Sequence, residues 1–571
     1  MKHLSARLIT IFSAHLTSHP ISMKRPRGDT RSPSSVGLII QSSPLTCPSP
    51  PETIAMSHSF ENLFPELYPL IASHIPLHAT PQTLLSLAIT NRHFSEFILP
   101  LVHQCLILRD EDSIMKALHK ISVDSAFGIR VRELHLICMG SISKKDDAFD
   151  TIKELEKVVA AGALPNLHTL GLRSCEYESN PDDHPNFWAI VNEHCRWLRR
   201  IRLMDVYGAE YLTPKERDFH WLRSSGVFQI PDVSTLSFRV TNVNLKDQHC
   251  TSFLSTLTLW THSLQTLSLS LLVHEDVSLS AFYCLNFPCL RSLTLDIWSV
   301  NQPSEAMDFW TRHPNLESLT LCCADGVKCF VDSIPRGFLP HLRHLKASYV
   351  DVRALAPVLP QLTSLAVHDG INSQVPYLLR SVIPGGLPGL KSLYFVRGPW
   401  DKNAVAEGTS WYETYDGAFH EIKKKKKKSD KSDRNILRDY MLSIARGTPN
   451  IEELGFPYVE SLSGLVEVSD VFSDLRRLKR IYYGMHFEDG DDPNEATIAH
   501  VLALAKESFI PCLESVTNLN DDIPYPVARI IRDENGNPCD VVLGTGGGME
   551  VGNEDSAFLF YYPNNVTCSI D

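Results

Sequence analysis

The sequence has few of the features that mark membrane, secreted or disulfide-bonded proteins. Its 571 residues contain no run of about 20 apolar residues, which a membrane-spanning helix requires. No secretory signal is present, and the 14 cysteines are scattered along the chain instead of forming a closely spaced disulfide framework. These absences predict a cytoplasmic or nuclear protein, or one found in both compartments, with reduced thiols and no membrane contact.

Catalytic and cofactor-binding motifs are also missing. The sequence has no His-Glu-x-x-His motif, no Gly-x-Ser-x-Gly motif and no kinase signature. Gly544–Gly548 is rich in glycine, but it lacks the Lys-Ser/Thr pair of a P-loop and indicates a flexible turn. Cys322 and Cys323, with Cys329 nearby, do not predict a zinc site, because adjacent residues of a strand point to opposite faces. We therefore expect no enzymatic activity, no cofactor and no bound metal.

Positive charge is in short supply over the chain as a whole. Lys and Arg number 54 against 66 Asp and Glu, a net charge of −12, which argues against a protein built mainly to bind nucleic acid. The exception is the lysine run Lys423–Lys428, inside a basic insertion predicted over residues 397–434. Mutual repulsion favours a solvated, disordered loop there, although such a run could also bind nucleic acid, an acidic partner or an import receptor.

What the chain does contain is a repeated phrase of leucines. The pattern Leu-x-x-Leu-x-Leu, or a close variant, begins at Leu290, Leu316, Leu342 and Leu362, and the first three lie 26 residues apart. Such a period is typical of leucine-rich repeats, in which each phrase forms one strand of a shared sheet. A proline stands two residues before each of these phrases, where it would end the helical half of a unit.

The phrase continues on both sides of this stretch. Further units begin at Val131, Leu167, Leu198, Val233, Leu264, Leu390, Ile451, Leu478 and Leu513. One unit alone cannot bury enough apolar surface to offset the cost of ordering its backbone, so neighbouring units must share a core. The predicted fold class is an α/β solenoid, an irregular leucine-rich-repeat horseshoe over residues 109–483. A C-terminal cap and tail over residues 484–571 should contain a helix over Thr497–Ser508 and a β-hairpin turning at Asn535-Gly536.

Residues 1–57 are predicted to form a disordered leader, because Pro, Ser and Thr dominate from Pro26 to Thr53. Lys24-Arg25-Pro26-Arg27 could serve as a nuclear address or remain merely solvated. The leader could also be an upstream extension of the coding sequence, since the first foldable segment starts at Met56.

Residues 58–108 have the periodicity of helices. Apolar residues step by three or four from Leu63 to Ile75, a second helix is predicted to start at Thr80-Pro81, and a third is predicted over residues 91–99, ended by Pro100. Three helices of this length have little core of their own. We therefore expect the bundle to dock onto a partner.

This helical segment resembles an F-box. The similarity rests on Phe64-Pro65-Glu66-Leu67, which is close to the hydrophobic-Pro-x-Glu-Leu opening of that family, and on Leu84-Leu85-Ser86-Leu87-Ala88 downstream, with Phe94 where Trp is common. Followed by leucine-rich repeats, the segment makes the whole chain similar to the fungal F-box/leucine-rich-repeat proteins.

The resemblance implies a substrate receptor. Its bundle would dock on a Skp-type adaptor and through it on a cullin scaffold, and the repeats would present an unknown protein substrate for ubiquitination and proteasomal degradation. The implied adaptor interface comprises Phe64, Pro65, Leu67, Ile71, Leu84, Leu85 and Leu87. Some of these side chains could instead hold the three helices together.

Strand positions that alternate with the core leucines face out of the sheet, so they are the candidate substrate-binding residues. Bulk and charge gather at Arg173, Arg200, Arg202, Arg239, Asp296, Lys346, His368 and Tyr394. The arginines could bind an acidic or phosphorylated segment, although solvated arginines are common on exposed sheets. The alternative function is a leucine-rich-repeat scaffold or inhibitor-type interaction protein with no ligase role. A GTPase-activating repeat protein is a third alternative, but no catalytic arginine stands out.

Overall fold

The structure, a computed structural model, describes residues 67–68, 84–85, 87–89, 92–108, 111–137, 151–173, 186–204, 225–245, 253–273, 280–297, 303–322, 328–368, 377–395, 430–456, 462–483, 493–508, 510–519 and 525–546. The chain divides into two compact units. One comprises Met1–Pro76 and Gln82–Leu101, and the other comprises Leu77–Pro81 and Val102–Asp571. Within the described ranges, no helix has the length and apolarity needed to cross a membrane.

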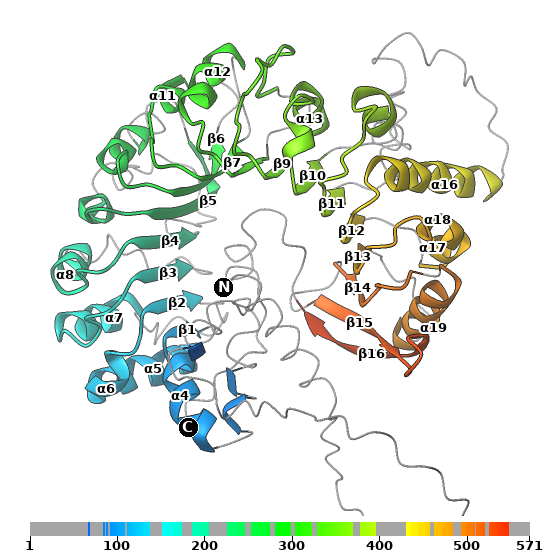
Figure 1. The fold of residues 1–571 in the computed structure, drawn as a ribbon. Helices are drawn as coiled ribbons and strands as arrows, with labels where there is room; N and C mark the ends of the chain where they lie inside the picture. Colours follow the sequence, from blue (N-terminus) through cyan, green and yellow to red (C-terminus); the bar gives the residue numbers. More distant parts are fainter. Residues whose placement is uncertain are drawn as a thin grey trace, which may run out of the picture. The chain divides into compact units, whose positions relative to one another are not determined.

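The second unit is built on one sheet of 16 strands whose spatial order follows the chain order (Figure 1). Strands β1 to β14 pair in parallel, and β15 and β16 continue the sheet in antiparallel fashion. The strands are β1 Cys105–Leu108, β2 Glu133–Ile137, β3 Thr169–Arg173, β4 Arg200–Met204, β5 Thr235–Leu245, β6 Thr266–Val273, β7 Ser292–Ile297, β8 Ser318–Leu321, β9 His344–Ser348, β10 Ser364–His368, β11 Ser392–Phe395, β12 Glu453–Phe456, β13 Arg480–Tyr483, β14 Ser515–Asn518, β15 Tyr525–Arg532 and β16 Pro538–Gly546.

Helices connect the strands and lie along one side of the sheet (Figure 1). They are α5 Glu111–Val123, α6 Ser125–Gly128, α7 Thr151–Ala160, α8 Phe187–His194, α11 Ser280–Tyr283, α12 Pro303–Arg312, α13 Tyr349–Ala354, α16 Asp430–Gly447, α17 Leu462–Glu467, α18 Ser469–Phe472 and α19 Pro493–Glu507. Short 3-10 helices also precede β5, β6 and β10, at Gly226–Gln229, Leu257–Trp260 and Leu359–Gln361.

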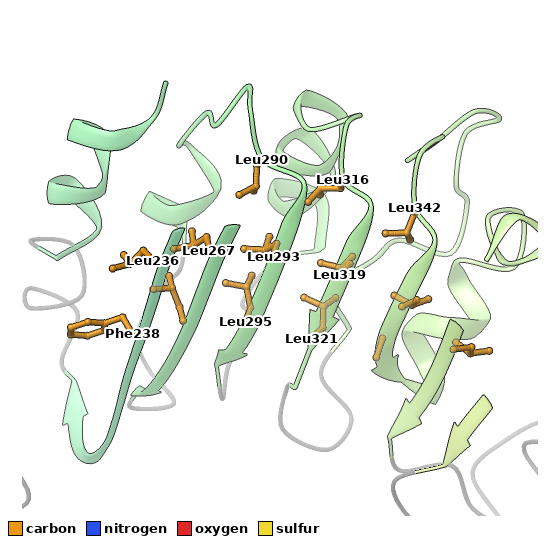
Figure 2. Close-up of a cluster of buried hydrophobic side chains, with 14 of the residues drawn as sticks. Leu236, Phe238, Leu267, Leu290, Leu293, Leu295, Leu316, Leu319, Leu321 and Leu342 are labelled. Atoms are coloured by element: carbon orange, nitrogen blue, oxygen red, sulfur yellow. The ribbon is translucent and has the colours of Figure 1, made fainter. Parts of the chain in front are cut away.

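The core consists of leucine rows that run across the strands. Leu236, Leu267, Leu293 and Leu319 are register partners on four successive strands, and all are buried (Figure 2). Complete burial of each such side chain contributes about 1.5–3 kcal/mol, so a row shared by many units stabilises what a single unit could not. This repeated strand-and-helix architecture is compatible with the predicted α/β solenoid.

A side-chain amide also joins some neighbouring units. Asn166, Asn315 and Asn450 each stand directly before the first apolar residue of a phrase. Their Nδ2 groups donate to the carbonyl oxygens of Ile129, Pro288 and Pro388, at 2.9, 3.4 and 2.9 Å. Each acceptor lies two residues before the first apolar residue of the preceding unit's phrase. The proline that precedes each asparagine was visible as a repeat signal, whereas the amide contact was not.

All thirteen predicted phrases lie on strands, but the sheet extends past both predicted boundaries of residues 109–483. At one end β1 pairs with β2, so residues 105–108, assigned to the helical bundle, belong to the sheet. At the other end β14 continues the parallel series beyond residue 483. The predicted helix near residue 500 and the hairpin are present as α19 and as β15 with β16.

Two other sequence predictions differ from the structure, and two fall outside the described residues. β16 runs to Gly546, so the start of the glycine-rich segment, predicted as a flexible turn, is paired strand instead. Helix α16 begins at Asp430, inside the stretch assigned to the basic insertion. Residues of its later turns, such as Tyr440 and Ile444, pack into the core and anchor this helix. The predicted leader and the lysine run lie outside the described residues.

In the first unit the described helical residues are 67–68, 84–85, 87–89 and those of α4 Arg92–Val102 up to Leu101, where that unit ends. The rings of Tyr68 and Phe97 stack with their centroids 5.7 Å apart. Helix α4 continues past Pro100, which we expected to end it. A proline in the last turn removes one backbone donor, and the helix ends within two residues of it.

Candidate functional site

The side of the sheet opposite the leucine core is the candidate partner-binding surface. We call it the polar face, and define it as the residues of β1 to β14 that alternate with the core side chains. Parallel pairing in register places equivalent residues of successive units next to one another, about 4.8 Å apart. Residues that are 20 or more apart in sequence therefore form continuous rows on this face.

Arg173, Arg202 and Arg239 come from three neighbouring strands, β3, β4 and β5. Arg173 pairs with Met204, and Met204 pairs with Arg239, while Arg202 lies two residues before Met204 on the same side. All three arginines are half-buried, and each makes further contacts. The register thus brings three of the four predicted arginines into one patch, which we call the arginine patch.

The fourth arginine, Arg200, is tied to an acid. Its Nη1 donates to Oε1 of Glu133 over 3.4 Å, across the intervening strand β3. Burial alone would raise the pKa of Glu133, but the neighbouring His135 ring and the charges of Arg200 and Arg202 outweigh it and hold that pKa below its usual value. Glu133 is therefore a carboxylate at neutral pH.

In the middle of the polar face the predicted acid has a short-chain partner. Ser270 of β6 donates its hydroxyl to Oδ2 of Asp296 on β7 over 2.7 Å. The neighbouring positions are small and polar, and Asp296 remains partly exposed. On this part of the face, hydroxyl and carboxylate groups of the strands are available to a binding partner.

Toward the end of the array the polar face becomes aromatic. Lys346, Ala366, Tyr394, Gly455 and Tyr482 are register partners in one row across β9 to β13. Ala366 and Tyr482 are buried and form a small apolar cluster, with Tyr394 and Leu519 packed against it. The predicted Tyr394 thus belongs to an apolar patch, with the predicted Lys346 beside it, that residue-by-residue reading of the sequence did not reveal.

His368 is the remaining predicted residue of this face. It lies in β10 and pairs with Ser348 of β9, and its side chain is outside the described residues.

Sequence reasoning missed a second charged row, formed by Ser392, Glu453 and Arg480. Ser392 donates its hydroxyl to Oε2 of Glu453 over 2.9 Å, and Arg480 forms an ion pair with Oε1 of the same carboxylate. Glu453 is buried despite its charge, which its two partners compensate. Reading the residue directly before the second apolar position in every phrase would have exposed this row, because opposite charges follow one another there.

The residues implied for adaptor binding divide into buried and exposed ones. Leu84 and Leu87 are buried and Leu67 is half-buried, whereas Leu85 is 37% exposed. Ile89, one turn further along, is 78% exposed. Phe64, Pro65 and Ile71 lie outside the described residues. Buried leucines offer a partner little surface. Among the described residues of 58–108, the exposed large apolar side chains are Leu85, Ile89 and Leu99.

Comparison with known families and proteins gives no assignment: no family model matches the chain, and no curated protein matches it.

Proposed function

We propose that this chain is a substrate-recognition adaptor. Its N-terminal helices would bind a Skp-type adaptor of a cullin ubiquitin ligase, and the polar face would hold a target protein for ubiquitination and proteasomal degradation. Within this proposal the second unit is a leucine-rich-repeat solenoid and the first is an F-box.

The observation that carries the proposal is the two-sided burial of the helical residues 84–85 and 87–89. Leu84, Leu87 and Ala88 are buried at i, i+3 and i+4, while Leu85 and Ile89 are exposed at i and i+4. A helix with one side in its own bundle and a second apolar side in solvent is typical of a segment that docks onto a partner. The F-box resemblance names the partner class.

The polar face supplies the other half of the argument. It combines the arginine patch, the carboxylates Asp296 and Glu453, and the apolar patch around Tyr394 on one continuous sheet. Arginine and tyrosine are the side chains most enriched at energetically important protein contacts. Such a surface fits a protein or peptide partner better than a small-molecule substrate.

The test is co-purification of the Skp-type adaptor with variants that add charge on the exposed side of the helix. Leu85→Glu with Ile89→Glu should abolish adaptor binding, because both glutamates would have to be desolvated in the contact. Leu259→Glu is the control, since Leu259 is an apolar side chain of the other unit whose exposure, 63%, lies between those of Leu85 and Ile89. Charges at Leu84 or Leu87 would not discriminate, because they would disrupt the bundle itself.

Undiminished adaptor binding by the Leu85→Glu/Ile89→Glu variant would refute this interface. If the wild-type chain captures partner proteins but no adaptor, the repeat unit is instead a scaffold or inhibitor-type interaction protein.

A further inference from the structure

Three side chains with metal-binding chemistry meet at the start of the sheet. Cys105 lies on β1, and Glu133 and His135 lie on β2. Cys105 and Glu133 are register partners, and His135 is two residues further along β2, so all three point to the polar face. Cys105 stands 28 residues before Glu133 and 30 before His135, in another unit, which is why no spacing motif revealed the group.

Their donor atoms are close to the spacing of a coordination shell. Sγ of Cys105 is 3.9 Å from Oε2 of Glu133, and that oxygen is 3.8 Å from Nε2 of His135. The three donor atoms all lie within 4.8 Å of one another. A tetrahedral zinc ion with normal bond lengths holds S, N and O donors about 3.3–3.6 Å apart. Small side-chain adjustments would close the difference.

The burial of His135 is the feature of this group that is hardest to explain if no ligand is bound. Its side chain is only 1% exposed, yet Nδ1 has no hydrogen-bond partner in the part of the chain that the structure describes. Nε2 faces Oε2 of Glu133 at 3.8 Å, an ion-pair distance that is too long for a hydrogen bond. Buried polar atoms are normally paired, so the orphaned imidazole points to a missing partner.

The surroundings fit the same reading. A Cβ atom on Gly171 would overlap Nδ1 of His135, so the glycine of β3 leaves the room that the ring occupies. Arg200 holds Oε1 of Glu133 and leaves Oε2 facing Cys105 and His135. The carboxylate is thus oriented by a neighbour, as is usual for metal ligands.

We propose that Cys105, Glu133 and His135 bind a zinc ion. Thiolate, imidazole and carboxylate together suit zinc, and the two negative charges neutralise it beside the arginines. Three protein ligands leave a fourth position, which faces the polar face and takes a water molecule or a donor atom from a bound partner. The site joins β1 to β2 and does not depend on the proposed ligase role.

The first test measures metal binding by the purified full-length chain after treatment with a chelator. Zinc should bind with about one equivalent per chain, and Co²⁺ in its place should give the visible bands of tetrahedral cobalt with a thiolate charge-transfer band. Cys105→Ser should remove the charge-transfer band and weaken zinc binding at least about 10-fold. Gly171→Ala keeps all three ligands but displaces the His135 ring, and it should weaken zinc binding about 10–100-fold. Cys539→Ser, at an exposed thiol of β16, should leave both readouts unchanged.

A second measurement needs no variant. Zinc should protect Cys105 from alkylation, followed by peptide mass spectrometry, while Cys539 reacts equally with and without the metal. Equal alkylation of Cys105 in both conditions, or a cobalt charge-transfer band that survives Cys105→Ser in a folded protein, would overturn the proposal.

Discussion

The backbone N–H of Phe287 donates a hydrogen bond to Nε2 of His313, 2.8 Å away, although the two residues belong to different repeat units. Nδ1 of the same ring lies 2.6 Å from the carbonyl oxygen of Phe309, to which it donates. Both ring nitrogens are therefore used by the neutral imidazole, with one as acceptor and one as donor. A second proton on Nε2 would break the contact between the units.

His313 should make stability depend on pH. Burial lowers its pKa, and the neighbouring charge of Arg312 acts in the same direction. Because the unfolded state, with a pKa of about 6.5, takes up the proton first, stability is lost as pH falls from about 6.5 toward the folded-state pKa. His313→Gln should flatten the slope of Tm between about pH 7 and pH 5, and lower Tm somewhat at pH 7.5. His341→Gln, at an exposed histidine, should leave the slope unchanged. Parallel curves for wild type and His313→Gln would contradict the assignment.

Asp351 organises the loop between β8 and β9. Its Oδ1 accepts hydrogen bonds from the backbone N–H groups of Cys329 and Phe330 at 2.7 and 3.2 Å, and its Oδ2 accepts one from the hydroxyl of Ser348 at 2.9 Å. Burial raises the pKa of this carboxyl, while those three hydrogen bonds oppose the shift.

Removing the Asp351 side chain should be strongly destabilising. Asp351→Ala would leave two buried backbone donors without partners, at a cost of about 3 kcal/mol or more in the free energy of unfolding. Asp332→Ala, which removes an exposed carboxylate of the same loop, should change it by about 0.5 kcal/mol or less. Urea unfolding of the two variants measures the difference, and equal midpoints would show that Asp351 does not hold the loop.

The asparagines before the repeat phrases show which contacts cannot be predicted from the sequence. The leucine phrases predicted thirteen strands because a strand of this fold needs only its alternating apolar residues, and those are local. Asn315 donates to Pro288 of the preceding unit, and this contact depends on how two units stack.

The same limit holds for the polar face. Glu453 and Arg480 are unremarkable in their own phrases and become an ion pair only through the register of β12 and β13. The residues predicted to bind the adaptor were the hardest to assign. Leu84 and Leu85 are adjacent leucines, and only packing decides which one is buried.

Gly386 should tolerate no side chain. Its φ is +64°, and a Cβ there would lie 2.6 Å from the carbonyl oxygen of Gly447, which also accepts the backbone N–H of Leu387. The contact joins the segment before β11 to the end of α16. Gly386→Ala should cost at least about 1–2 kcal/mol, from the left-handed backbone and the displaced oxygen.

Gly385→Ala is the matched control for this position. The neighbouring glycine has open space around its Cβ position and no positive φ, so the substitution should leave the free energy of unfolding nearly unchanged. Thermal unfolding of both variants separates the two cases. Similar Tm values would mean that the Gly447 contact adds little to stability.

The arginine patch should govern which partners the polar face captures. Arg202 and Arg239 lie on neighbouring strands of the patch, and both are half-buried, so their guanidinium groups are presented in fixed positions. A charge-assisted hydrogen bond contributes about 1.5–3 kcal/mol, so Arg202→Gln with Arg239→Gln should weaken an acidic or phosphorylated partner at least about 10-fold. Arg476→Gln with Arg477→Gln removes the same charge from the exposed turn before β13 and controls for net charge. Affinity capture with quantitative mass spectrometry, from extracts treated or not treated with phosphatase, compares the proteins bound by wild type and by each variant. An unchanged Tm of the variants verifies that they are folded. If the Arg202 and Arg239 variant enriches the same proteins to the same degree as wild type, recognition uses the apolar patch around Tyr394 instead.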